Sequence, residues 1–147
     1  MKNRAAIPVL PCHCASLRKA ARHLSQAYDE ALAPSGLRIT QFSLLAAISL
    51  TQEGEPTLRE LAETMGMDRS TLGHNLRPLE REHLVSLETG RADARSRSVV
   101  LTPQGREKLN QAAPLWRAMQ ARFEAGYGKG PSASLRASLL RVAGMPF

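Results

Sequence analysis

The segment from residue 57 to 102 constrains the fold of this chain most, because it predicts two short capped helices followed by a hairpin. Thr57 and Glu60 have the spacing of a capping box, in which each side chain accepts a hydrogen bond from a backbone N–H at the helix start. Gly66 is placed to end this first helix, and Asp68 is suited to cap a second one. The apolar residues of the second helix share one face: Leu72, Leu76 and Leu79. Two short helices joined by a glycine turn are typical of a helix-turn-helix that enters the major groove of DNA.

The outward face of the second helix is hydroxylated and basic. With the leucines pointing inward, the following residues lie on or beside the opposite face: Arg69, Ser70, Thr71, His74, Arg77 and Arg81. The hydroxyls suit phosphates or base edges, and Arg77 can form a bidentate pair with guanine. An ordinary solvated helix face has the same pattern, so this face alone does not decide between the two interpretations.

A hairpin is predicted directly after the second helix. Residues 84–87 and 98–101 are short, partly alternating apolar segments, as in strands, and the polar, glycine-containing stretch 88–97 between them has the composition of a hairpin tip. A hairpin that follows a reading helix is a wing, and the wing favours the DNA interpretation over a solvated surface.

The charged residues of the hairpin tip are suited to DNA. We expect Arg95 to enter a minor groove, where a narrow A·T stretch concentrates negative potential. Arg91 and Arg97 are expected to contact phosphates, and Asp93 to support the shape of the wing by pairing with a nearby arginine. The alternative is a solvated charged turn, which is the common fate of such runs.

Composition is consistent with a DNA-binding protein but does not locate the binding surface. The 147-residue chain has a net charge of +7 and a pI near 10.2, whereas residues 57–102 hold seven arginines and seven acids. No apolar run approaches the roughly 18 residues that a membrane span needs, and two cysteines two positions apart make no disulfide framework, which predicts a cytoplasmic protein without a membrane partner. The chain has no phosphate loop or nucleophile motif, so we expect no enzyme activity and no cofactor.

Helices are predicted on both sides of this segment, within a single domain of residues 1–147. Residues 12–33 carry a helical apolar stripe, and Thr40 is expected to cap a helix over 41–50 that is apolar nearly all round and therefore buried. Thr102 and Pro103 start a long helix, a break follows at 126–131, and a last short helix carries Leu135, Leu139, Leu140 and Val142. We expect residues 40–102 to form the winged helix-turn-helix lobe. We expect 12–35 and 103–147 to form dimerisation helices, because a core this small cannot cover their apolar stripes.

Three stretches resemble the MarR family of transcriptional regulators. Residues 93–105 match its wing signature, Asp-x-Arg followed by Leu-Thr-x-x-Gly, residues 68–82 resemble its recognition helix, and 37–45 resemble its second helix. The resemblance implies a mostly α fold with a small β wing, in which a winged helix-turn-helix is flanked by N- and C-terminal dimerisation helices. It also implies a homodimer, usually a repressor, that binds palindromic double-stranded DNA and releases it when a small molecule, often an aromatic acid, or an oxidant acts. Gly73-His74 and His83 depart from the residues frequent at those positions.

The family's effector cleft lies between the dimerisation helices and the DNA-binding lobe, and we assign residues to it by this resemblance. The candidates are Cys14, Arg18, Arg22, His23 and Phe42. Arg18, Arg22 and His23 could pair with a ligand carboxylate, although cations on a helix are more often solvated.

Cys12-His13-Cys14 admits a second interpretation, in which thiols and imidazole sense an oxidant or a soft metal. The spacing gives poor tetrahedral reach, and packing of Cys14 as a small apolar residue is the simpler account, so we predict no metal site. A winged-helix module that docks proteins is the alternative to DNA binding, but such a module has no need of three arginines in its wing.

Overall fold

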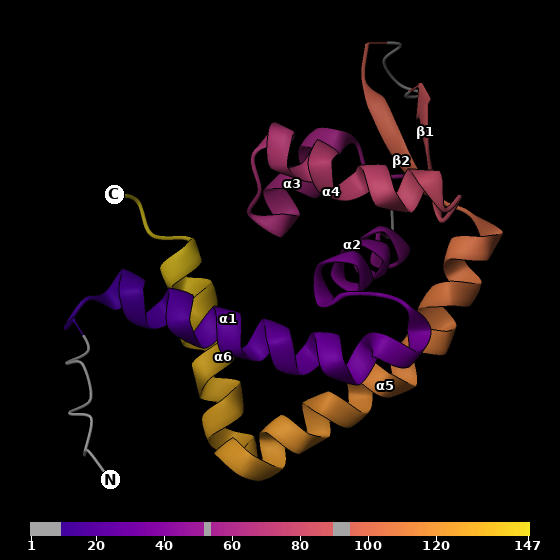
Figure 1. Ribbon diagram of the computed structural model, residues 1–147. Helices are drawn as coiled ribbons and strands as arrows, with labels where there is room; N and C mark the ends of the chain where they lie inside the picture. Colours follow the sequence, from indigo (N-terminus) through magenta and orange to yellow (C-terminus); the bar gives the residue numbers. More distant parts are fainter. Residues whose placement is uncertain (1–9, 52–53, 90–94) are drawn as a thin grey trace, which may run out of the picture.

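The computed structural model describes residues 10–51, 54–89 and 95–147, and its helices and strands follow the predicted order. Helix α2 lies at the centre, with α3, α4 and the hairpin on one side and the long helices α1 and α5 on the other (Figure 1). This architecture confirms the predicted fold class, mostly α with a small β wing. The elements are α1 (His13–Leu32), the 3-10 turn η1 (Ala33–Ser35), α2 (Ile39–Leu50), α3 (Leu58–Met65), α4 (Arg69–Arg81), β1 (Val85–Thr89), β2 (Arg97–Leu101), α5 (Pro103–Tyr127) and α6 (Lys129–Ala143).

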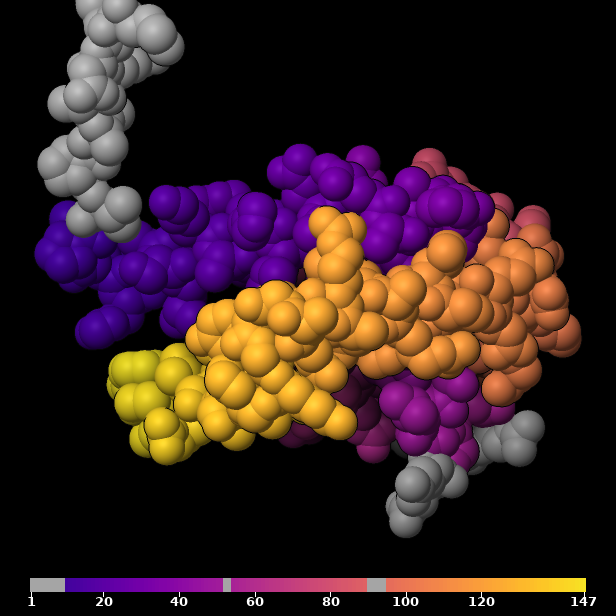
Figure 2. All heavy atoms as spheres, turned by 90° about the horizontal axis from the view of Figure 1, so that it is seen from below, coloured from indigo at the N-terminus to yellow at the C-terminus, as the bar shows by residue number. Residues whose placement is uncertain are grey.

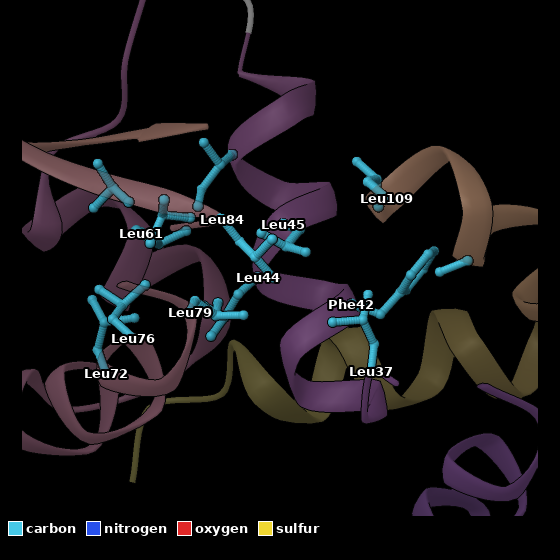
Figure 3. Packing of buried hydrophobic residues seen from close by; sticks show 14 of the residues in the cluster. Leu37, Phe42, Leu44, Leu45, Leu61, Leu72, Leu76, Leu79, Leu84 and Leu109 are labelled. Carbon is cyan, nitrogen blue, oxygen red and sulfur yellow. The ribbon is translucent and has the colours of Figure 1, made fainter. Parts of the chain in front are cut away.

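Helix α2 is the hub of the core, as its apolar composition predicts. Leu44 and Leu45 are fully buried, and the helix packs against α1, α3, α4, α5 and β2. Figure 3 shows Leu44 and Leu45 meeting Leu79 of α4 and Leu84, while Phe42 lies at the far end of the same cluster. One helix therefore holds the winged helix-turn-helix lobe and the long helices in a single core.

The prediction that Thr40 caps α2 is wrong. The helix begins two residues earlier than predicted, at Ile39, with Arg38 as its N-cap residue. The side chain of Gln41 accepts a hydrogen bond from the Arg38 N–H at 2.9 Å, and Asp29 of α1 accepts one from the Ile39 N–H at 2.7 Å. The cap thus comes partly from another helix, which a local sequence motif does not reveal.

The wing is a two-stranded antiparallel hairpin in which Val85 pairs with Leu101 and Thr89 with Arg97. Its second strand is also tied to the segment before α3, since the Val99 N–H donates to the Pro56 carbonyl at 2.9 Å. This additional pairing fixes the base of the wing against the helix-turn-helix.

Helix α6 begins earlier than the sequence indicates. Residues 126–131 were expected to break the chain, yet α5 continues to Tyr127 and α6 starts at Lys129. Gly128 makes the turn with a φ of 98°, and Pro131 lies in the first turn of α6, where a missing N–H removes no helical hydrogen bond.

His83 is the single non-glycine residue with a positive φ in the part of the chain that the structure describes, at 56°. It lies in the tight turn between α4 and β1, and a side chain in this left-handed conformation costs about 1–2 kcal/mol. We therefore expect His83→Gly to stabilise the protein by about 1 kcal/mol, measured as a higher urea midpoint with an unchanged slope. His74→Gly on helical α4 is the matched control and is expected to destabilise by a few tenths of a kcal/mol. A lower midpoint for His83→Gly would contradict this account.

Candidate nucleic-acid interface

The start of the reading helix α4 is fixed by its cap. The Asp68 carboxylate accepts hydrogen bonds from the N–H of Thr71 at 2.7 Å and from its hydroxyl at 2.9 Å. This confirms the predicted cap and shows that the Thr71 hydroxyl, which the sequence assigns to DNA, donates to Asp68. Asn75 donates to the Thr71 carbonyl at 2.8 Å, one turn further on.

Two hydrogen bonds hold the pKa of Asp68 below its ordinary value. The bond from the Thr71 N–H has the larger effect, and the bond from the Thr71 hydroxyl has the smaller one. A lowered pKa means that the ionised form stabilises the fold above the ordinary pKa and that this stability is lost as pH falls through the folded-state pKa. We therefore expect Asp68→Asn, which keeps a capping oxygen, to resemble the wild type at pH 7 but to lose less stability below about pH 4.

Thermal midpoints between pH 7 and pH 3 measure this difference. Glu88→Gln on β1 is the control for removing an exposed carboxylate elsewhere in the lobe. If Asp68→Asn followed the same acid-induced decline as the wild type, the carboxylate would have no role in the pH dependence.

Helix α4 is amphipathic as predicted. Its leucines Leu72, Leu76 and Leu79 are at most 1% exposed. The residues predicted on its outer face are all exposed: Arg69, Ser70, Thr71, His74, Arg77 and Arg81. His74, Arg77 and Arg81 line one open hollow along the second half of the helix together with Glu80. The structure thus presents a basic and hydroxylated surface along the whole of this helix.

A groove of about 520 Å³ lies between the start of α3, the start of α4 and the base of the wing. Four arginines line it: Arg59, Arg69, Arg95 and Arg97. Arg95 and Arg97 were predicted from the hairpin and Arg69 from the reading helix, so the structure brings these three together. A concave surface lined by arginines from three elements is suited to bind a phosphate backbone.

Arg59 was not predicted as a member of this surface. It lies on α3, and its Nε donates to Glu63 at 2.9 Å in an ion pair across one helical turn, which raises the pKa of the guanidinium. The spacing of Arg59 and Glu63 is visible in the sequence, but it indicates a solvated helix face. Only the folding of the wing against α3 brings Arg59 to the other arginines. Arg91 and Asp93, predicted for the tip, lie outside the described residues.

The predicted effector residues fall into two places. Cys14, Arg18, Arg22 and His23 are exposed on α1. Phe42 is buried on α2, where its ring stacks on that of Trp116 of α5 with centroids 5.6 Å apart. Phe42 and Trp116 line a cleft to which none of the four α1 residues contributes.

The two cysteines are free thiols; Cys12 is half-buried at the N-cap of α1 and Cys14 is exposed. Across residues 10–51, 54–89 and 95–147, no three His, Cys, Asp or Glu side chains are grouped so that they could hold a metal ion.

No single helix in the described ranges is long and apolar enough to span a membrane. Helices α1 and α2 reach that length and composition only when taken together, and they meet at an angle of 75°.

The fold and the basic surface define the class, a winged helix-turn-helix protein, and comparison with solved structures identifies the family. The transcriptional regulator MosR of M. tuberculosis, solved in complex with DNA, is 45% identical; the match covers 90% of this chain and 93% of MosR with a TM-score of 0.81. A MarR-family regulator from Rhodococcus sp. RHA1 is 25% identical over 90% of this chain and 94% of its own, with a TM-score of 0.76. The chain belongs to the MarR family of transcriptional regulators.

The third relative is CouR of Rhodococcus jostii RHA1, at 25% identity. The transcriptional repressor bound to a 23-mer DNA duplex matches 90% of this chain and 92% of its own, with a TM-score of 0.79. For the structure of the same protein bound to p-coumaroyl-CoA, the match covers 93% of this chain and 95% of CouR, with a TM-score of 0.77. No protein-family model and no curated protein matches the chain.

Proposed function

We propose that this protein is a homodimeric repressor of transcription that binds palindromic DNA through α4 and the wing and is released by a small-molecule effector. The observation that carries the proposal is the convergence of Arg59, Arg69, Arg95 and Arg97 in one groove beside the exposed face of α4. The complex of MosR with DNA supports it, because that regulator is 45% identical to this chain. The protein would act in the cytoplasm, where it meets its operator.

In this proposal α4 enters the major groove. Arg77 reads base edges, assisted by Ser70, His74 and Arg81, and Thr71 fixes the start of the helix through Asp68. Arg69 and Arg97 neutralise phosphates, and Arg95, with Arg91 and Asp93 of the tip, places the wing in the adjacent minor groove.

Dimerisation would use the face formed by α1, α5 and α6. Figure 2 shows this face, with α5 lying between α1 and α6. Several apolar side chains on it and in the adjoining C-terminal segment are exposed in the single chain: Leu17, Tyr127, Leu139, Leu140, Val142, Met145 and Phe147. A second copy would cover them, and the resulting two-fold axis would place the two reading helices on half-sites about 34–36 Å apart.

Ligand control is supported by CouR, a repressor that has been solved both on DNA and with p-coumaroyl-CoA. An effector can release DNA only through its different affinity for the bound and released states, so a coupling of about 1–3 kcal/mol is the expected scale. An aromatic acid near Arg18, Arg22 and His23 on α1 is one candidate effector. Oxidation of Cys12 and Cys14 is the alternative trigger, since both thiols are free.

The proposal is tested by an anisotropy titration of the purified protein against the intergenic DNA beside its own gene, at several salt concentrations. We expect tight binding to an inverted repeat and a linear fall of log affinity with log salt, with a slope of about −0.9 for each phosphate contact. Repeating the titration after thiol oxidation tests the alternative trigger. Weak binding that is blind to sequence would contradict a repressor and favour the protein-docking module.

A further inference from the structure

Helix α3 carries an exposed ion pair between Arg59 and Glu63. The Arg59 Nε donates to Glu63 Oε1 at 2.9 Å, and the two side chains are 77% and 65% exposed. Such a pair contributes little to stability, because water screens both charges. Arg59 lies in the first turn of α3 and Glu63 near its end, so each charge meets the end of the helix dipole that disfavours it. The stability of α3 therefore does not account for this pair.

The arginine of this pair also lines the groove between α3, α4 and the wing, together with Arg69, Arg95 and Arg97. Glu63 is not among the described residues that line the groove. A guanidinium has five N–H donors, and the bond to Glu63 uses the one on Nε. The two terminal nitrogens of Arg59 can therefore still donate to a phosphate in the bidentate manner typical of arginine.

Holding the guanidinium in advance lowers the cost of binding. A long, exposed arginine side chain samples many rotamers, and fixing them on DNA costs conformational entropy. Glu63 restricts Arg59 before DNA arrives, from one turn further along the same helix. The carboxylate also has an opposite effect, since its negative charge repels phosphates. The two effects predict opposite results when Glu63 is removed, so an experiment can separate them.

We propose that Glu63 is a positioning residue for DNA binding, which holds Arg59 by its Nε so that the terminal nitrogens of the guanidinium donate to a backbone phosphate in the arginine groove. The inference rests on the proposed function and adds to it a residue that would not touch DNA itself. A phosphate contact carries no sequence information, so we expect the effect of Glu63 on any duplex.

Anisotropy titrations of the purified protein test the proposal on two duplexes of equal length, the intergenic DNA beside its own gene and a mixed-sequence duplex. We expect Glu63→Ala to weaken binding to both about 3-fold or more, although this change removes a negative charge. Glu63→Gln keeps an oxygen that accepts from Arg59, and it is expected to bind at least as tightly as the wild type. Unchanged or tighter binding of Glu63→Ala would overturn the proposal.

Glu88→Ala is the matched control for removing an acid. Glu88 is exposed on β1 and forms no ion pair within residues 10–51, 54–89 and 95–147. Its removal is expected to leave the affinity unchanged or to raise it, because only the repulsion of phosphates is lost. Alanine favours helix, so Glu63→Ala is expected to keep the wild-type thermal midpoint. A loss of binding that came with a lowered midpoint would show damage to α3 and overturn the proposal.

Removing Arg59 is expected to reverse the effect of Glu63. Arg59→Ala alone should weaken binding and reduce the salt slope by about 1 for each protomer, because one phosphate contact is lost. In that background Glu63 has no arginine to hold and only repels the duplex. Adding Glu63→Ala to Arg59→Ala is therefore expected to tighten binding. If Glu63→Ala weakened binding equally with and without Arg59, the proposal would be overturned.

The wild-type titration decides the proposed function separately. If the wild type prefers the intergenic duplex but Glu63→Ala binds more tightly, the positioning role fails and the proposed function stands. If the wild type binds both duplexes alike while the variants behave as expected, the positioning role stands and the repressor function fails. Absence of binding to either duplex would overturn both.

Discussion

Replacing Gly105 with alanine is expected to destabilise the protein by about 3 kcal/mol, the upper end of the usual cost of overpacking. Gly105 is buried in the first turn of α5, where an added Cβ would overlap the carbonyl oxygen of Leu84 and lie 2.8 Å from Cδ1 of Leu101. The Leu84 carbonyl cannot move away freely, because it accepts hydrogen bonds from the Thr102 N–H at 3.1 Å and the Thr102 hydroxyl at 3.0 Å. Relief of the overlap therefore breaks the junction between α4, the wing and α5.

Urea unfolding and thermal scans measure this loss, and a midpoint about 6–12 °C below that of the wild type is expected for a domain of this size. Gly126→Ala is the matched control: Gly126 lies on the same helix, and its Cβ would meet nothing within 4 Å. That variant is expected to stabilise the protein by about 0.5–1 kcal/mol, because glycine inside a helix is unfavourable. A wild-type midpoint for Gly105→Ala would show that the close approach at Leu84 relaxes at no cost.

Helix starts set by contacts within three residues could be predicted from the sequence. Thr57, Asp68 and Thr102 each accept a hydrogen bond from the backbone N–H three positions ahead, as the motifs indicate. The amphipathic pattern of α4 likewise predicted which of its faces is buried, because an apolar stripe on a helix packs against the core. Helix α2 is apolar nearly all round, and this composition predicted that the whole helix is buried.

Features that depend on contacts between distant segments could not be predicted. The cap of α2 involves Asp29, which belongs to α1, and the base of the wing depends on the pairing of Val99 with Pro56. Neither Asp29 nor Val99 lies in a local sequence pattern that indicates its hydrogen-bonding partner. The start of α6 was missed for a different reason, since a proline in the first turn of a helix gives the same sequence signal as a proline in a loop.

The same division applies to the candidate site: its local features could be predicted from the sequence, and its contacts between distant segments could not. The face of α4 follows from helical periodicity, whereas the position of Arg59 beside Arg97 requires the wing to fold back on α3. The effector residues show the limit most clearly. The sequence grouped Phe42 with cations of α1, but its partner in the structure is Trp116, which the sequence indicates only as one member of an apolar helix stripe. Which distant apolar residue meets Phe42 is decided by tertiary packing.

Replacing Arg77 with alanine is expected to lower affinity for the operator at least ~30-fold. Arg77 is exposed on the outer face of α4, and its guanidinium forms no ion pair with any residue of the described ranges. A bidentate arginine–guanine pair contributes about 1–3 kcal/mol of discrimination, and a dimer loses two such pairs at once. Arg77→Lys keeps the charge but loses the planar fork, so we expect it to lose most of the discrimination while keeping the salt dependence.

Anisotropy titrations against the operator and against a scrambled duplex separate base reading from phosphate binding. Arg77→Ala is expected to weaken operator binding far more than binding to the scrambled duplex, whereas Arg97→Ala is expected to weaken both alike and to reduce the salt slope by about 1 for each protomer. Arg38→Ala serves as the control for loss of one positive charge, because that side chain is 81% exposed at the N-cap of α2 and pairs with Asp29 of α1 at 4.0 Å. Equal losses on both duplexes for Arg77→Ala would assign Arg77 to the phosphates and leave base reading to the remaining side chains of the α4 face.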